Sequence, residues 1–142
     1  MNLVKDMLTR KDRATVSVLP SLSVFDALKV MAENNIGAVV VMENNLFLGL
    51  FTERDYSRKV ILKGKNSSGT TVSEIMTIDL PHTEPEDSIE HCMKLMTVGN
   101  IRYLPVFEKG KLLGIISISD VIKETIVNQQ ETIDHLNNYI NS

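Results

Sequence analysis

Apolar positions along the chain change their period several times, and each period predicts one element. Residues 15–19 alternate and are rich in β-branched side chains, which predicts a short strand. Apolar side chains then fall at helical spacing over residues 24–31, where Ser23 is placed to cap a helix and Asn35 to end it. The continuous apolar run of residues 38–42 is typical of a strand buried on both faces.

A hairpin and a second helix complete this first set of elements. Residues 43–45 are polar and predict a turn, and residues 46–51 predict the returning strand. A helix is expected to start near residues 52–55 and to continue to about residue 63. The predicted order is therefore strand, helix, strand, strand, helix.

The same order returns 65 residues further along the chain. Residues 20–61 and 85–126 are identical at more than a quarter of their aligned positions, whereas average residue usage gives roughly two or three matches by chance. Further upstream, residues 4–9 face residues 72–77 at an offset of 68, so the first copy carries three extra residues around positions 10–14. An internal repeat of this kind determines how the whole fold is interpreted.

The second copy repeats the elements of the first. Its strands are expected near residues 82–84, 104–107 and 111–116, and its helices over residues 88–98 and from residue 119. Because a half of roughly 60 residues is marginal alone, we expect the two copies to pack through their sheets about a pseudo-two-fold axis. The predicted fold class is α/β (α+β), with two related clefts at the shared interface and a long C-terminal helix.

These patterns predict a division of the chain into four parts. The first repeat spans residues 1–63, a polar linker spans 64–71, the second repeat spans 72–127, and a C-terminal helical extension spans 128–142.

Each copy ends its last strand with one seven-residue pattern: Gly, two apolar residues, a hydroxyl, two further residues and Asp. Its members are Gly49, Thr52 and Asp55 in the first copy and Gly114, Ser117 and Asp120 in the second. The hydroxyl can cap the following helix, and a carboxylate one turn later can accept hydrogen bonds from the two hydroxyls of a ribose. Plain helix capping explains either copy alone, but the recurrence in one structural position favours ligand binding.

This repeat order, with its two Gly-x-x-Ser/Thr-x-x-Asp strand ends, resembles a tandem pair of cystathionine-β-synthase (CBS) domains, also called a Bateman module. The resemblance covers residues 4–127, and residues 52–60 and 101–106 are similar to those of stand-alone bacterial two-CBS proteins. It implies a regulatory module with adenine-nucleotide binding in clefts between the repeats. The usual ligands of the family are AMP, ADP, ATP, S-adenosylmethionine and NAD(H).

The resemblance also implies which residues contact the nucleotide. It assigns the ribose to Asp55 in one cleft and Asp120 in the other, with Thr52 and Ser117 as the matching hydroxyls. The adenine is expected to be bordered by residues of both repeats. In the cleft of Asp120 these are Val16, Ile36, Gly37 and Ile115, and in the cleft of Asp55 they are Leu50, Asp79, Leu80, Pro81 and Ile101.

Basic residues are the candidates for phosphate contacts, because a guanidinium fork matches phosphate oxygens. Arg54 and Arg102 are the best placed. Lys11, Arg13 and Arg58 are weaker candidates, for which solvated surface charge is an equally good explanation.

Composition narrows the remaining function classes. The net charge of −3 and pI of about 5.6 argue against a nucleic-acid or membrane partner. The single Cys excludes an internal disulfide and Cys-rich zinc sites, and it favours a reducing, cytoplasmic setting. The three His residues are scattered, and no nucleophile, base and orienting residue occur together. We therefore expect no catalytic residue, no metal site and no catalytic cofactor.

The end of the chain carries a second periodic feature. Five apolar residues and one Gln recur at alternating spacings of four and three residues, and we call them the seam: Ile122, Ile126, Gln129, Ile133, Leu136 and Ile140. This heptad spacing predicts a helix that outruns the folded repeat and pairs with a second copy. A helix folded back on its own domain is the alternative, and it is less favoured because a core of this size has little apolar surface left to cover the stripe.

Together these features indicate an adenine-nucleotide-binding sensor for AMP, ATP or NAD(H). It would act through a ligand-dependent conformational or dimer rearrangement, on itself or on an unidentified regulated protein. The alternative is a ligand-free structural protein for dimerisation or interaction, and an enzyme ranks third because the acid, base and metal groups are missing.

Overall fold

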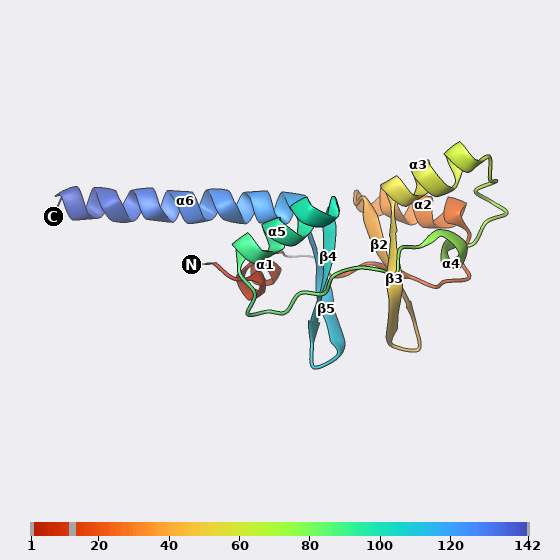
Figure 1. Cartoon of the computed structure of the whole chain (residues 1–142), viewed down its shortest axis with the longest axis horizontal. Coiled ribbons are helices and arrows are strands. Elements are labelled where there is room, and N and C mark those ends of the chain that lie inside the picture. The colour runs from red at the N-terminus through yellow and green to blue at the C-terminus, as the bar shows by residue number, and fades with distance from the viewer. Residues whose placement is uncertain (1, 12–13, 142) are drawn as a thin grey trace. The chain divides into compact units, whose positions relative to one another are not determined.

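The chain divides into two compact units that do not coincide with the two sequence copies. The computed structural model describes residues 2–11 and 14–141 (Figure 1). Unit 1 comprises residues 1–13 and 81–142, and unit 2 comprises residues 14–80. Each sequence copy thus has its first segment in one unit and its remaining elements in the other.

Unit 2 is built around a three-stranded sheet in the order β1-β2-β3. The short β1 (Ser17–Val18) pairs in parallel with β2 (Ala38–Glu43), which pairs antiparallel with β3 (Leu46–Thr52). The helices of the unit are α2 (Val24–Asn34), α3 (Glu53–Lys59), the 3-10 helix η1 (Ile61–Lys63) and α4 (Val72–Ile75). The mixed α+β class predicted from the repeat is confirmed.

Local sequence signals determine where α2 begins and ends. The Ser23 hydroxyl oxygen accepts the backbone N–H of Asp26 at 3.0 Å, which satisfies one of the unpaired donors of the first turn. Asn35 ends the helix in the left-handed conformation at φ 53°, a position that Asn tolerates better than most residues. In the hairpin, Asn44 and Asn45 both adopt positive φ, as a tight two-residue turn requires. These sequence predictions are confirmed.

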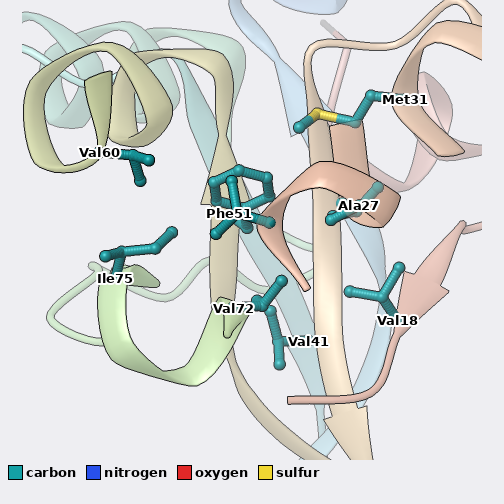
Figure 2. Packing of buried hydrophobic residues seen from close by; sticks show 10 residues of the cluster. Val18, Ala27, Met31, Val41, Phe51, Val60, Val72 and Ile75 are labelled. Atoms are coloured by element: carbon teal, nitrogen blue, oxygen red, sulfur yellow. The ribbon is translucent and has the colours of Figure 1, made fainter. Parts of the chain in front are cut away.

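The core of unit 2 is aliphatic around one aromatic ring. Figure 2 shows Phe51 of β3 with Val60 and Ile75 on one side and Ala27 and Met31 on the other. The Phe51 side chain is fully buried, and truncating such a ring to Ala typically costs about 3–5 kcal/mol. The core therefore joins the sheet, α2 and α4.

Unit 1 has a two-stranded antiparallel sheet formed by β4 (Tyr103–Glu108) and β5 (Lys111–Ser117). Its helices are α1 (Val4–Arg10), α5 (Ile89–Gly99) and α6 (Ile118–Asn141). Val4 and Met7 of α1 lie in the same buried cluster as Cys92 of α5 and Leu104 of β4. The first helix of the chain therefore completes the core of the second repeat.

Two elements differ from the sequence prediction. The strand expected at residues 82–84 is a single bridge, in which Thr83 pairs with the β4 strand through Pro105 and Phe107. Pro residues on both sides, at 81 and 85, remove the N–H donors that a longer strand would need. The helix expected to reach about residue 63 ends at Lys59 and continues as η1.

The last helix is the longest element. α6 is continuous over 24 residues, about 36 Å at the rise of an α-helix. Its C-terminal half extends past α5 and α1 of the same unit (Figure 1). None of the described helices is long and apolar enough to cross a membrane.

Gly49→Ala is expected to destabilise the chain by about 1–3 kcal/mol, because a Cβ there would lie 2.6 Å from the backbone oxygen of Thr77. Gly69→Ala is the matched control, since its Cβ would meet neighbours no closer than 3.8 Å. Chemical denaturation compares the two variants with the wild type, and equal stabilities for the two variants would contradict the close approach of Thr77.

Candidate functional site

The predicted strand end of the first copy forms a reciprocal cap at the start of α3. The Thr52 hydroxyl accepts the N–H of Asp55 at 3.1 Å, and Asp55 Oδ2 accepts the N–H of Thr52 at 3.0 Å. The Thr52 hydroxyl also donates to Oδ2 at 3.1 Å. The hydroxyl and the carboxylate are therefore adjacent, as their spacing predicts.

The second oxygen of Asp55 is also taken. Asp55 Oδ1 accepts the Thr77 hydroxyl at 2.7 Å and the Lys59 ammonium at 3.0 Å. Thr77 is placed by two backbone hydrogen bonds with Leu50, at 2.9 and 2.8 Å. Asp55 is 5% exposed. Its charge is thus buried with four donors from its own unit.

The strand end of the second copy has the same cap with a different cation. Ser117 Oγ accepts the N–H of Asp120 at 3.1 Å, and Asp120 Oδ2 accepts the N–H of Ser117 at 2.8 Å. Lys11, the residue that ends α1, donates to Oδ2 at 2.9 Å and to the Ile115 carbonyl at 2.8 Å. The Asp120 side chain retains 19% of its exposure, so it is more accessible than Asp55.

The surroundings of Asp120 favour its ionised form. Partial burial acts to raise the pKa of the carboxyl, but the hydrogen bonds from Ser117 and the charge and hydrogen bond of Lys11 outweigh it. The pKa of Asp120 therefore lies below its ordinary value. The side chain carries a negative charge at neutral pH.

The other predicted contact residues divide between the units. Those in unit 2 include Val16 and Ile36, which pack beside the core, and Gly37, whose carbonyl accepts the N–H of Glu53 at the start of α3. In the same unit Leu50 is buried, Arg54 and Leu80 are half-buried, and Asp79 is exposed. In unit 1 Ile101 packs beside the core, Pro81 and Ile115 are half-buried, and Arg102 is exposed.

The predicted clefts combine residues from both units, so their composition stays a prediction. Within each unit, the structure brings together the hydroxyl and the acid of the pattern and the strand residue two positions before the hydroxyl, which is Leu50 or Ile115. Of the weaker basic candidates, Lys11 contacts Asp120, Arg58 is exposed in the last turn of α3, and Arg13 lies outside the described residues.

Two residues of this arrangement were not predicted as site residues. Lys59 lies four positions after Asp55, a spacing that places both side chains on one face of a helix. Thr77 comes from the segment after α4, and no sequence signal connects it with Asp55. Its role depends on the pairing of that segment with β3.

Other reactive groups are buried or scattered. Within residues 2–11 and 14–141, no group of three or more His, Cys, Asp or Glu side chains could hold a metal ion. Cys92 is fully buried in unit 1, and burial, reinforced by the charge of Asp87, raises the pKa of its thiol to about 11. The thiolate form needed for nucleophilic attack is therefore scarce at neutral pH.

Comparison with known proteins relates this arrangement to one family. The sequence model of the CBS domain matches twice, at residues 4–61 and 72–126. The CBS domain-containing protein CBSX3 of Arabidopsis thaliana, described as mitochondrial, is 39% identical over 123 residues. That match covers 83% of this chain but 60% of the relative, so the chain spans less than two thirds of that protein.

Two solved structures share the fold. A putative signal-transduction protein with CBS domains from Burkholderia ambifaria is 43% identical with a TM-score of 0.86, and the match covers 90% of this chain and 96% of that one. The CBS domain pair of protein MJ0100, solved in complex with 5-methylthioadenosine and S-adenosyl-L-methionine, has a TM-score of 0.77. Its identity is 22%, with coverage of 90% of this chain and 98% of that one, so it shows the fold alone.

Asp120→Asn is expected to lower the melting temperature at pH 7 and to lose this effect as the pH falls below the ordinary pKa of an Asp carboxyl. A carboxyl whose pKa is lower in the folded chain stabilises the fold when ionised, and this contribution disappears as the pH falls through the folded pKa. Thermal denaturation across this pH range measures the difference between variant and wild type. Glu33→Gln, which neutralises an exposed acid on α2, is the control, and a pH-independent difference for Asp120→Asn would contradict the interpretation.

Proposed function

The chain belongs to the CBS-domain family, and from this premise we propose that it is a regulatory module that binds an adenosine-containing ligand, AMP, ATP or NAD(H). The observation that carries the proposal is the adjacent hydroxyl and carboxylate at both strand ends. An adenosine ligand is also what the MJ0100 pair holds, in the form of methylthioadenosine and S-adenosylmethionine.

The chemistry of these groups suits a ribose. A carboxylate is an acceptor with about four lone-pair positions, so it can receive both hydroxyls of the sugar. Ionised Asp120 meets this requirement at neutral pH, and Lys11 beside it offers a cation for a phosphate. For Asp120 we assign the adenine to the apolar residues predicted from the family: Val16, Ile36, Gly37 and Ile115.

The proposed action is regulation without catalysis. Binding shifts the populations of conformations or of dimer arrangements by as much as the ligand's affinities for them differ. The output is either a change in the chain's own assembly or contact with a regulated protein. We propose a cytoplasmic setting and assign no role to nucleic acid or membrane.

An adenine ligand is expected to raise the melting temperature, because a ligand that binds only the folded chain stabilises it. At a concentration 100 times the dissociation constant, the free energy of unfolding rises by roughly 2.7 kcal/mol. The measurement is a thermal-shift panel of AMP, ATP, NAD+, NADH and S-adenosylmethionine, with GTP as the control for base identity. The double variant Asp55→Asn/Asp120→Asn is expected to lose the shift. The proposal fails when no adenine ligand at millimolar concentration shifts the wild type.

We also propose that the chain forms a homodimer through α6, which supports the second candidate function, a ligand-free dimerisation or interaction protein. The apolar seam residues are each at least half exposed: Ile122, Ile126, Ile133, Leu136 and Ile140. The opposite face of α6 is used inside unit 1, where Val121 and Glu124 are buried and Glu124 pairs with Arg10 at 3.0 Å. The seam therefore faces away from its own unit.

A second copy of α6 fits this seam in spacing and charge. Ile occupies three consecutive a positions and Leu136 a d position, a combination that favours two parallel strands. The flanking e and g positions carry one charged residue, Lys123, so two identical helices meet little like-charge repulsion. Gln129 at a d position can pair with its copy and determine the register.

Ile133→Glu/Leu136→Glu is expected to convert a dimer into a monomer, because it places four acids in the shared seam. The matched control is His135→Glu/Asn138→Glu, which adds the same charge to the other face of α6 and is expected to leave the dimer intact. Sedimentation gives the mass, and circular dichroism checks the helix content. A monomeric wild type, or equal masses for the two variants, contradicts the dimer.

A further inference from the structure

The two Asp carboxylates of the repeated pattern differ in how many donors they already have. All four acceptor positions of Asp55 are matched by four donors from unit 2, two from Thr52, one from Thr77 and one from Lys59. Asp120 Oδ2 receives the Ser117 N–H and the Lys11 ammonium, and no described residue of its unit donates to Oδ1. Asp120 therefore has acceptor positions for a ligand, and Asp55 does not.

The difference originates in the segments that precede the two repeats. Helix α4 ends at Ile75, so Thr77 leaves it and pairs with β3 at Leu50. Helix α1 continues to Arg10, and Thr9, which aligns with Thr77, stays in the helix and donates to the carbonyl of Lys5. In unit 2 Thr77 hydrogen-bonds with Leu50 of β3. At the aligned strand residue of unit 1, Ile115 of β5, the carbonyl accepts the Lys11 ammonium instead.

The cations of the two copies differ as well. Lys59 is on the same helix as Asp55, and its ammonium also contacts the Ile75 carbonyl at 3.1 Å and the Thr77 hydroxyl at 3.2 Å. The residue that aligns with Lys59 in the second copy is Glu124, whose buried carboxylate pairs with Arg10 and Asn2. Lys11 supplies the cation for Asp120 from another element, on a flexible stem at the end of α1.

We infer that Asp55 is an internal brace, that Asp120 is the carboxylate that receives the ribose, and that Lys11 is an exchangeable cation that moves from Asp120 to the ligand's phosphate. The inference rests on the proposed function and adds which copy binds and which residue reads the phosphate. When ribose hydroxyls donate to Asp120, they satisfy acceptor positions of the carboxylate and so weaken its attraction for the Lys11 ammonium. A phosphate then offers it a stronger partner.

This assignment predicts a selectivity that the repeat alone does not. Because Lys11 neutralises Asp120 before binding, a nucleoside without phosphate must compete with it, whereas a nucleotide gives it a new partner. AMP and ATP should therefore bind more tightly than adenosine. Each chain should bind one ligand.

Titration calorimetry of the full chain with adenosine, AMP and ATP tests the inference, with Lys11→Met and Lys59→Met as matched cation variants. Lys11→Met is expected to weaken AMP at least 5-fold and to leave adenosine binding equal or tighter. Lys59→Met is expected to leave all three ligands within about 2-fold. Equal effects of the two variants, or a parallel loss of adenosine and AMP in Lys11→Met, would overturn the role of Lys11.

The pair Asp120→Asn and Asp55→Asn tests the assignment of the two acids. Asp120→Asn is expected to lose at least 10-fold in AMP affinity with a small change in melting temperature. Asp55→Asn is expected to lower the melting temperature by about 5 °C or more and to keep AMP affinity within about 3-fold. Two AMP molecules per chain, or the reverse pattern, overturn the inference while the proposed function stands.

The melting temperatures of the two variants without ligand also test the structural role of Asp55. A smaller loss for Asp55→Asn than for Asp120→Asn overturns it. When the wild type binds neither adenosine nor AMP nor ATP at millimolar concentration, the proposed function fails, and the assignment of Asp120 and Lys11 fails with it.

Discussion

The structure depends on how each small unit completes its core. A hairpin with one or two helices leaves an apolar face that needs a further element. In each unit that element is a short helix from the other sequence copy. Val4 and Met7 of α1 fill unit 1, and Val72 and Ile75 of α4 fill unit 2. Each unit buries its core side chains almost completely, although neither sequence copy contains the whole set of elements.

The short helix that each unit takes from the other sequence copy also determines which donor reaches the acid at the strand end. A residue that follows each short helix reaches the acid of the repeated pattern. In unit 2 it delivers the Thr77 hydroxyl to Asp55, and in unit 1 it delivers the Lys11 ammonium to Asp120. The two acids thus differ in having a hydroxyl or a cation supplied from the segment after the short helix.

Much of the fold follows from short-range signals in the sequence. Ser23 and Ser88 cap their helices, Asn35 and Asn100 end them, and the hairpin turns adopt positive φ at residues that the sequence marks as turns. The adjacency of each hydroxyl to its Asp follows from their three-residue spacing. The pairing of Thr77 with Leu50 does not, because it joins segments that are 27 residues apart and leaves no periodic pattern.

The site illustrates how a repeated motif can have two physical outcomes. The cap requires a hydroxyl and a carboxylate, and both copies satisfy it with nearly the same distances. Whether that carboxylate is also a ligand acceptor depends on the donors that approach it from elsewhere. Four donors and near-complete burial make Asp55 costly to disturb, since any ligand would have to replace bonds already made.

Asp120 has two donors from its unit and a side chain that is 19% exposed, so a ligand would replace fewer bonds there than at Asp55. Sequence identity between the copies therefore predicts the cap but not the binding capacity. Two differences between the copies set the donors around each acid. Lys59 aligns with Glu124, and Thr77 pairs with β3 whereas the aligned Thr9 stays in α1. Duplication in this chain has kept the geometry of the cap in both halves, while the donors around the two acids differ: Asp55 receives four from its own unit, and Asp120 receives the Ser117 N–H and the Lys11 ammonium.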